Sequence, residues 1–336
     1  MNSQKEVFIP LSKAGKVFGA LDENLHKIET AFGVVITMRG ENGVINGNEK
    51  DSERAADVLN KLLELEEITP QKINYLIESQ GEARLEDLQK IDADVICLTA
   101  SGRPIKPKTL GQKEYLDKIR ENTIVFALGP AGTGKTYLAM AMAVTALRKR
   151  QVSRIILTRP AIEAGERLGF LPGDMQAKVD PYLRPLYDAL FDLMGAENFQ
   201  KHVERNVIEV APLAYMRGRT LENSFIVLDE AQNTTPEQMK MFLTRIGFGS
   251  KAVATGDITQ ADLPLDKRNG LADAAEILSE VEGIGVCRLT LKDVARHPLV
   301  QKIIRAYEKR ETKTFYENKT KNKINKINKI KKERRA

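Results

Sequence analysis

Long apolar runs are absent from this 336-residue sequence. No stretch approaches the roughly 18 apolar residues that a membrane-spanning helix needs. The opening residues, MNSQKEVFIP, also lack the apolar stretch of a secretory signal. We therefore expect no membrane span and a cytoplasmic location. The hydrophobic content of 42% is sufficient for a packed core, and the length suggests two domains.

Cysteine and histidine are both scarce. The two cysteines, Cys97 and Cys287, lie far apart in the sequence, and neither has a partner at metal-ligand spacing. Reduced, partly buried thiols of a cytosolic protein are the expectation. The three histidines, His26, His202 and His297, show no metal-ligand or catalytic-triad spacing. Ordinary surface or packing roles are expected for them.

Net positive charge is confined to one segment. Residues 313–336 contain ten Lys or Arg and two Glu, so the other 312 residues sum to −2 although the whole chain carries +6. The repeated K-I-N triplets of this tail cannot bury enough apolar area to fold alone, which predicts a disordered basic tail. Such a tail suits phosphate backbones without sequence preference. A solubilising extension, or contact with an anionic membrane surface, remains an alternative.

The sequence GPAGTGKT, from Gly129 to Thr136, has the spacing G-x-x-x-x-G-K-[ST] of a phosphate-binding P-loop. The apolar run 123–128 before it predicts a strand buried on both faces. The segment after Lys135 is rich in Ala, Leu and Met and ends in basic residues, which predicts a helix. A strand before the loop and a helix after it are the context that this motif requires. A glycine-rich turn that binds nothing is the alternative.

The P-loop predicts a role for each of its residues. Backbone N–H groups from Gly129 to Gly134 are expected to bind the β-phosphate at a helix N-terminus. Lys135 is expected on the β and γ oxygens, and Thr136 on Mg²⁺. The predicted nucleotide-binding loop therefore consists of Gly129, Pro130, Ala131, Gly132, Thr133, Gly134, Lys135 and Thr136.

The stretch FIVLDEAQ, residues 225–232, places two carboxylates directly after an apolar run. Asp229 is predicted to bind the Mg²⁺ water shell, and Glu230 to activate the water that attacks the γ-phosphate. A kinase needs no such glutamate because its acceptor is a substrate hydroxyl. The pair therefore favours hydrolysis, although an acidic pair can also simply begin a helix.

A third motif is AVATGDITQADLP, residues 252–264. A predicted strand ends at Thr255, and Gln260 lies three residues beyond Asp257. The amide of Gln260 is predicted to donate to the γ-phosphate or to orient the attacking water. It would thereby report whether ATP or ADP is bound.

Strand-like runs alternate with helical ones after residue 105. This alternation predicts an α/β fold with a parallel sheet covered on both faces, and ligands at the carboxyl ends of the strands. The later predicted strands are 154–158, 207–210, 225–228, 252–255 and 286–289.

Together these motifs resemble motifs I, II and III of superfamily 1 helicases. The stretches KPKTLGQKEYL, TRPAIEAGERLGFLPGD, APLAYMRGRTLENSFIVLDEAQNTT and DVARHPLV are similar to the PhoH-like family of ATPases, over Lys106 to Glu308. The resemblance implies an ATPase that acts on RNA, with a RecA-like core that assembles in a ring. It also implies that Gln112 recognises adenine, through the N6 and N7 edge. ATP is favoured over GTP because the guanine-specifying N-K-x-D is absent from the predicted folded region.

The sequence carries one P-loop and residues enough for one core, whereas helicases close two such cores around one ATP. An arginine that stabilises the γ-phosphate must therefore come from a neighbouring subunit or from the end of this core. The candidates are Arg217, Arg219 and, ranked first, Arg296; for each, a plain surface arginine is the alternative. A homo-oligomer with ATP at its subunit interfaces is the expectation.

Four arginines could line a basic channel for single-stranded RNA, with solvated loop charge as the alternative. They are Arg159, Arg167, Arg217 and Arg219. Two other functions remain open: a P-loop kinase, and an assembly protein in which ATP only controls partner binding. Phosphate transfer to a product other than water would indicate the kinase.

Four segments are predicted along the chain. Residues 1–68 form a small α/β unit, 69–104 a helical connector and loop, 105–312 the P-loop ATPase core and 313–336 the basic tail. The stretch KVFGALDENLHKIETAFGVVI resembles a KH-type RNA-binding unit. Its phosphate-clamping G-x-x-G reads Gly19-Ala20-Leu21-Asp22 here, and the acidic Asp22 disfavours phosphate. A docking or assembly role is equally open for this KH-like domain.

Overall fold

A computed structural model describes residues 2–79, 84–160, 175–261, 263 and 268–294. Residues 1–294 form one compact unit. Arg167, Arg296 and the basic tail 313–336 lie outside the described residues, so the predictions made for them stay predictions. Among the described helices, none is long and apolar enough to cross a membrane.

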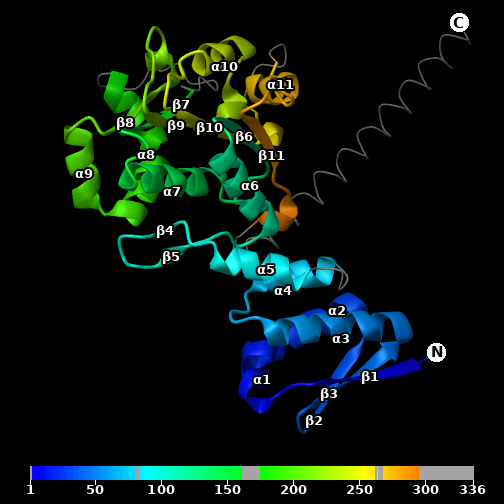
Figure 1. Ribbon diagram of the computed structural model, residues 1–336. Helices are drawn as coiled ribbons and strands as arrows, with labels where there is room; N and C mark the ends of the chain where they lie inside the picture. The colour runs from blue at the N-terminus through cyan, green and yellow to red at the C-terminus, as the bar shows by residue number, and fades with distance from the viewer. Residues whose placement is uncertain (1, 80–83, 161–174, 262, 264–267, 295–336) are drawn as a thin grey trace, which may run out of the picture. The chain divides into compact units, whose positions relative to one another are not determined.

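Six parallel strands form the central sheet of the segment after residue 105 (Figure 1). Their spatial order is β11-β6-β10-β9-β7-β8. The expected α/β class, with a parallel sheet and the P-loop directly after one of its strands, is confirmed. In chain order the strands span Ile124–Leu128 (β6), Arg154–Arg159 (β7), Ile208–Pro212 (β8), Ser224–Leu228 (β9), Lys251–Gly256 (β10) and Ile284–Arg288 (β11).

Helices cover both faces of this sheet, which explains why its strands are continuous apolar runs rather than alternating ones. Val125 and Ala127 of β6 pack into one hydrophobic cluster, while Phe126 and Leu128 of the same strand pack into another. The first cluster is covered by Leu110–Glu121 (α6), Lys135–Arg148 (α7), Met175–Met194 (α8) and Ala196–Glu204 (α9), and the second by Pro236–Leu243 (α10) and Gly270–Ile277 (α11).

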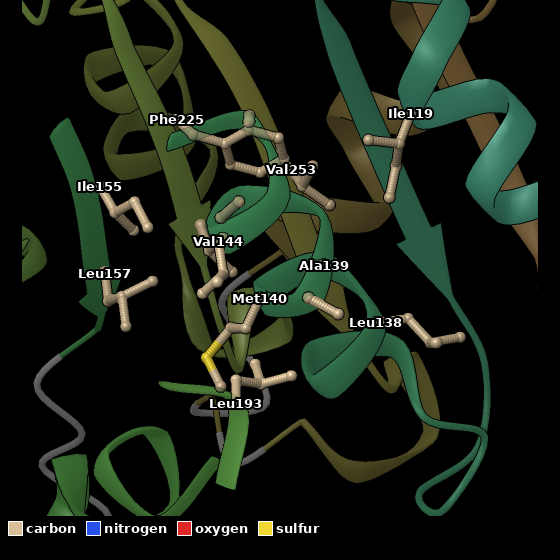
Figure 2. Packing of buried hydrophobic residues seen from close by; sticks show 14 of the residues in the cluster. Ile119, Leu138, Ala139, Met140, Val144, Ile155, Leu157, Leu193, Phe225 and Val253 are labelled. Carbon is tan, nitrogen blue, oxygen red and sulfur yellow. The ribbon is translucent and has the colours of Figure 1, made fainter. Parts of the chain in front are cut away.

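The helix α7, which follows the P-loop, lies at the centre of the first cluster. Figure 2 shows its Leu138, Ala139, Met140 and Val144 among side chains of the neighbouring strands, such as Ile155. Helices and strands pack more closely where alanine leaves little side-chain volume between them. This packing fixes the start of α7 relative to the carboxyl edge of the sheet.

Short 3-10 turns carry several of the residues at that edge. They span Leu213–Met216 (η3), Ala231–Asn233 (η4), Ile258–Gln260 (η5) and Leu291–Asp293 (η6).

The N-terminal segment folds as a three-stranded antiparallel sheet, in the order β1-β3-β2, with helices packed on one face. Its elements are Asn2–Phe8 (β1), Leu11–Phe18 (α1), Ala20–Asp22 (η1), Glu23–Phe32 (α2), Val35–Arg39 (β2), Asn42–Asn48 (β3) and Glu49–Glu64 (α3). The sequence does not predict the first strand, because residues 2–6 are all polar and show no apolar alternation. The KH resemblance stays a hypothesis.

The segment in place of the G-x-x-G clamp joins α1 to α2. Leu21 and Asp22 both have left-handed backbones, with φ of 51° and 58°, and Leu21 is 96% exposed. A leucine in this conformation is uncommon, whereas aspartate is one of the residues that adopt it more readily. The loop therefore presents an apolar side chain and a carboxylate where a phosphate clamp would present backbone N–H groups.

Residues 69–104 contain two helices and a short hairpin. These are Pro70–Glu78 (α4), Leu85–Ala93 (α5), Cys97–Leu98 (β4) and Pro104–Ile105 (β5). Both helices bury residues in the hydrophobic cluster of the N-terminal sheet, Ile73 and Leu76 from α4 and Leu88 and Ile91 from α5. The connector therefore also contributes to a core.

Candidate active site

The three predicted motifs meet at the carboxyl edge of the parallel sheet. The P-loop follows β6, Asp229 and Glu230 follow β9, and Asp257 follows β10, which lies between the other two. Because the strands are parallel, all three loops emerge at one edge, where ligands bind in folds of this type.

The P-loop adopts the backbone that its glycines permit. Gly129, Gly132 and Gly134 have φ of 157°, 88° and 78°, values that other residues rarely adopt. A β-carbon on Gly129 would lie 2.6 Å from the carbonyl oxygen of Leu289. The loop turns directly into α7, so the unpaired N–H groups of that helix N-terminus point toward the edge of the sheet. This backbone fits a phosphate group.

Lys135 is almost fully buried and folds back over the loop. Its Nζ donates to the carbonyl oxygens of Gly129 at 2.6 Å and of Pro130 at 2.9 Å. The ammonium group is thus fixed at the edge where the N–H groups predicted to bind phosphate lie.

Tyr115 holds the backbone of Lys135 in place, because its hydroxyl donates to the carbonyl oxygen of Lys135 at 3.1 Å. Burial raises the pKa of Tyr115 well above its usual value, so the hydroxyl stays protonated and remains a donor. Sequence reasoning missed this residue, whose only signal is its apolar spacing in α6.

Thr136 and Asp229, the predicted magnesium pair, are in direct contact. The Thr136 hydroxyl donates to Oδ1 of Asp229 at 2.6 Å, and the Thr255 hydroxyl donates to the same oxygen at 2.9 Å. Mg²⁺ prefers oxygen ligands and is usually held by one or two carboxylates together with substrate phosphates. Among the described residues no cluster of three or more His, Cys, Asp or Glu could hold a metal. One carboxylate with a hydroxyl beside a phosphate loop is the donor set that nucleotide-bound Mg²⁺ needs.

Arg159, expected in an RNA channel, contacts the predicted catalytic carboxylates. Its Nε lies 2.7 Å and its Nη2 2.5 Å from Oδ2 of Asp229. Nη2 also lies 3.6 Å from Oε1 of Glu230. Its position as the last residue of β7, next to β9 in the sheet, explains the contact, but only the strand order reveals it.

Glu230 differs from Asp229 in backbone and exposure. It has a left-handed backbone with φ of 53°, a strained conformation that concentrates at functional sites. Its side chain is 42% exposed, whereas that of Asp229 is 4% exposed. Glu230 therefore has access to water, and Asp229 faces the protein donors around it.

Gln232 links two of the motifs and was missed by sequence reasoning. Its Nε2 donates to Oε2 of Glu230 at 2.7 Å, and its Oε1 accepts from the backbone N–H of Asp257 at 3.1 Å. The side chain is 2% exposed. A buried amide with both ends bonded fixes one carboxylate oxygen of Glu230 relative to the third motif.

In the third motif, Asp257 rather than Gln260 contacts the P-loop. Oδ2 of Asp257 accepts from the backbone N–H of Ala131 at 3.2 Å. Gln260 is exposed at the end of η5, and its backbone N–H donates to the Asp257 carbonyl. The sensor role of Gln260 stays a prediction. The signal for Asp257 in the sequence is its place directly after the Gly that ends a strand.

Gln112 lies at the N-terminus of α6 and is buried against the P-loop. Its Oε1 accepts from the backbone N–H of Lys108 at 2.7 Å, and its Nε2 donates to the carbonyl oxygen of Thr133 at 3.1 Å. One N–H and one lone pair of the amide remain beyond these bonds. Its role in adenine recognition stays a prediction.

The other predicted arginines lie elsewhere. Arg219 forms a two-pronged ion pair with Glu209, at 2.5 and 2.7 Å, whose hydrogen bonds raise the pKa of the guanidinium. Arg217 is exposed just after η3. The structure brings neither of them to Asp229 or Glu230.

Comparison with known proteins agrees with the motifs. Residues 104–308 match the family model described as PhoH-like protein. A PhoH-like protein of Bacillus subtilis is 50% identical over 301 residues, which are 88% of this chain and 94% of that protein. The chain belongs to the PhoH-like family. Protein PhoH of Escherichia coli is 47% identical over 206 residues, 61% of this chain and 58% of that protein.

Among solved structures, a Sulfolobus solfataricus SWI2/SNF2 ATPase core in complex with dsDNA covers 54% of this PhoH-like chain and 43% of its own. The identity is 13% and the TM-score 0.32, too low to inform the function.

Proposed function

We propose that this PhoH-like protein is a Mg²⁺-dependent ATPase whose hydrolysis is coupled to single-stranded RNA. The observation that carries the assignment of Mg²⁺-nucleotide binding is the 2.6 Å hydrogen bond between Thr136 and Asp229. It joins the phosphate-binding loop to the predicted metal-binding carboxylate, across the intervening strand β10.

Each residue of the site has a distinct part in binding. The P-loop N–H groups and Lys135 would hold the phosphates, and the Thr136 hydroxyl with Asp229 would hold Mg²⁺. Bound Mg²⁺ would neutralise the charge that develops on the phosphate oxygens. Gln112, next to the loop, supports ATP as the nucleotide through its remaining N–H and lone pair.

Glu230 would accept the proton of the attacking water. Three features support this role: its exposure of 42%, its left-handed backbone and the Gln232 amide that orients one of its oxygens at 2.7 Å. A general base must reach water and must be held by neighbours. A kinase would have no use for this arrangement, which favours hydrolysis over phosphate transfer to a second substrate.

RNA and a homo-oligomer are the proposed partners. The resemblance to helicase motifs, the exposed Arg217 and the basic tail support RNA. The presence of one P-loop in the chain supports an oligomer, in which a neighbouring subunit contributes to the ATP site.

The steady-state ATPase rate, with and without single-stranded RNA at low and moderate salt, tests the coupling. A several-fold stimulation that fades as salt rises is expected, because contacts with phosphate backbones weaken with salt. Arg217→Gln should reduce the stimulation, whereas Lys201→Gln, on the exposed helix α9, should not. Slow hydrolysis that RNA leaves unchanged at both salts would indicate the ATP-gated assembly protein instead.

A further inference from the structure

Asp229 is surrounded by protein donors on both of its carboxylate oxygens. Oδ1 accepts from the hydroxyls of Thr136 and Thr255, and Oδ2 accepts from Nε and Nη2 of Arg159. A carboxylate offers about four lone-pair sites in total. These four donors use them all, so any further ligand of Asp229 must displace one of them.

Arg159 is the donor that Mg²⁺ would displace. The two hydroxyls lie on Oδ1, and one of them, Thr136, is itself a predicted magnesium ligand. Arg159 carries a full positive charge onto Oδ2, and two cations on one carboxylate oxygen repel each other. The Arg159 side chain is 16% exposed, so solvent screens this repulsion only weakly.

A second carboxylate is within reach of the same guanidinium. Nη2 of Arg159 lies 3.6 Å from Oε1 of Glu230, whose other oxygen is bonded to Gln232. Release from Asp229 would therefore leave Arg159 beside the predicted general base without a large movement of the backbone of β7.

We propose that Arg159 is a positioning residue that competes with Mg²⁺ for Oδ2 of Asp229, so that filling of the magnesium site transfers its guanidinium from Asp229 to Glu230. The proposal rests on the proposed ATPase function and specifies how metal binding changes that site. It gives Arg159 a role that differs from simple support of Asp229: its removal should favour metal binding rather than weaken it.

The test measures the Mg²⁺ dependence of nucleotide binding, not turnover. A fluorescent non-hydrolysable ATP analogue is titrated with MgCl₂ against the full chain and against Arg159→Gln. The half-saturating Mg²⁺ concentration should fall roughly tenfold in the variant, because Oδ2 loses a charge-assisted competitor. The thermal unfolding midpoint should also rise more on addition of MgCl₂ and analogue than it does in the parent.

Two further variants separate the hydrogen bonds from the charge. Arg159→Lys keeps the charge but loses the two-pronged geometry, so its Mg²⁺ requirement should lie between those of parent and Arg159→Gln. Arg154→Gln removes the same charge from the opposite end of β7 and should behave as the parent. Arg159→Lys also keeps the test valid should Arg159→Gln fold poorly.

The outcomes distinguish this inference from the proposed function. If the half-saturating Mg²⁺ concentration of Arg159→Gln equals or exceeds that of the parent, Arg159 does not compete with Mg²⁺. The ATPase assignment would then stay intact. A parent chain that binds no ATP analogue at any Mg²⁺ concentration would overturn the function itself.

Discussion

Asp229 and Glu230 are neighbours in the chain, yet their surroundings give them different chemistry. Asp229 is buried among hydroxyl and guanidinium donors, whereas Glu230 reaches water and bonds to one buried amide. The surrounding donors hold the Asp229 carboxylate in one orientation, and access to water suits a group that must accept a proton. The left-handed backbone of Glu230 accompanies this difference in surroundings.

Removal of the Gln232 side chain should reduce both the stability of the fold and the rate of catalysis. Gln232→Ala leaves the N–H of Asp257 and one oxygen of Glu230 without their buried partner, which should cost about 1–3 kcal/mol. We expect a lower thermal unfolding midpoint together with a fall in the ATPase turnover rate. Gln200→Ala, on the exposed side of α9, is the matched control and should change neither. Parent-like turnover in Gln232→Ala would show that Glu230 needs no such support.

At the scale of elements, strand order decides the site. Insertion of β10 between β6 and β9 places Thr255 on Asp229 and Asp257 on the P-loop, and the adjacency of β7 and β9 places Arg159 there. The loops contribute the reactive groups, and the sheet sets the distances between them.

Substitution of Gly129 tests how closely the P-loop must pack against Leu289. Gly129→Ala would place a β-carbon 2.6 Å from the Leu289 carbonyl oxygen, so the loop must shift. We expect nucleotide affinity to fall at least tenfold, measured by equilibrium binding of the ATP analogue. Gly218→Ala has the same kind of left-handed strain, with φ of 75°, but open space around it. Its affinity should match the parent, and an equal loss in both variants would mean that general destabilisation is responsible.

The sequence predicted the elements of the core better than their arrangement. Each of the six strands was recognisable as a short, mostly apolar run, and the P-loop, Asp229 and Glu230 carry motif signals. Strand β1 was missed because residues 2–6 are polar, and a pairing with β3 is what makes them a strand. The contacts of Arg159 and Gln232 with the predicted catalytic carboxylates could not be predicted from the sequence. The contact of Arg159 depends on the strand order, and that of Gln232 depends on a buried amide that no residue spacing reveals.

At the scale of the whole molecule, the described residues include one P-loop core, and within them Arg159 is the arginine that contacts the predicted catalytic carboxylates. If a neighbouring subunit completes the ATP site, activity must depend on assembly. The ATPase rate per chain should then rise with protein concentration over the range in which light scattering detects association. A monomer that hydrolyses ATP at the full rate would refute the oligomeric site and leave Arg159 as the arginine to examine.

We expect Lys135 to bind the nucleotide and Glu230 to activate the water that hydrolyses it. The most direct measurement combines equilibrium binding of ATP with single-turnover phosphate release in Lys135→Ala, Glu230→Gln and, as control, Lys149→Ala at the far end of α7. Lys135→Ala should lose binding, and Glu230→Gln should bind ATP but release phosphate roughly 100- to 10,000-fold more slowly. Lys149→Ala should match the parent in both. Phosphate release by Glu230→Gln at the parent rate would contradict the account.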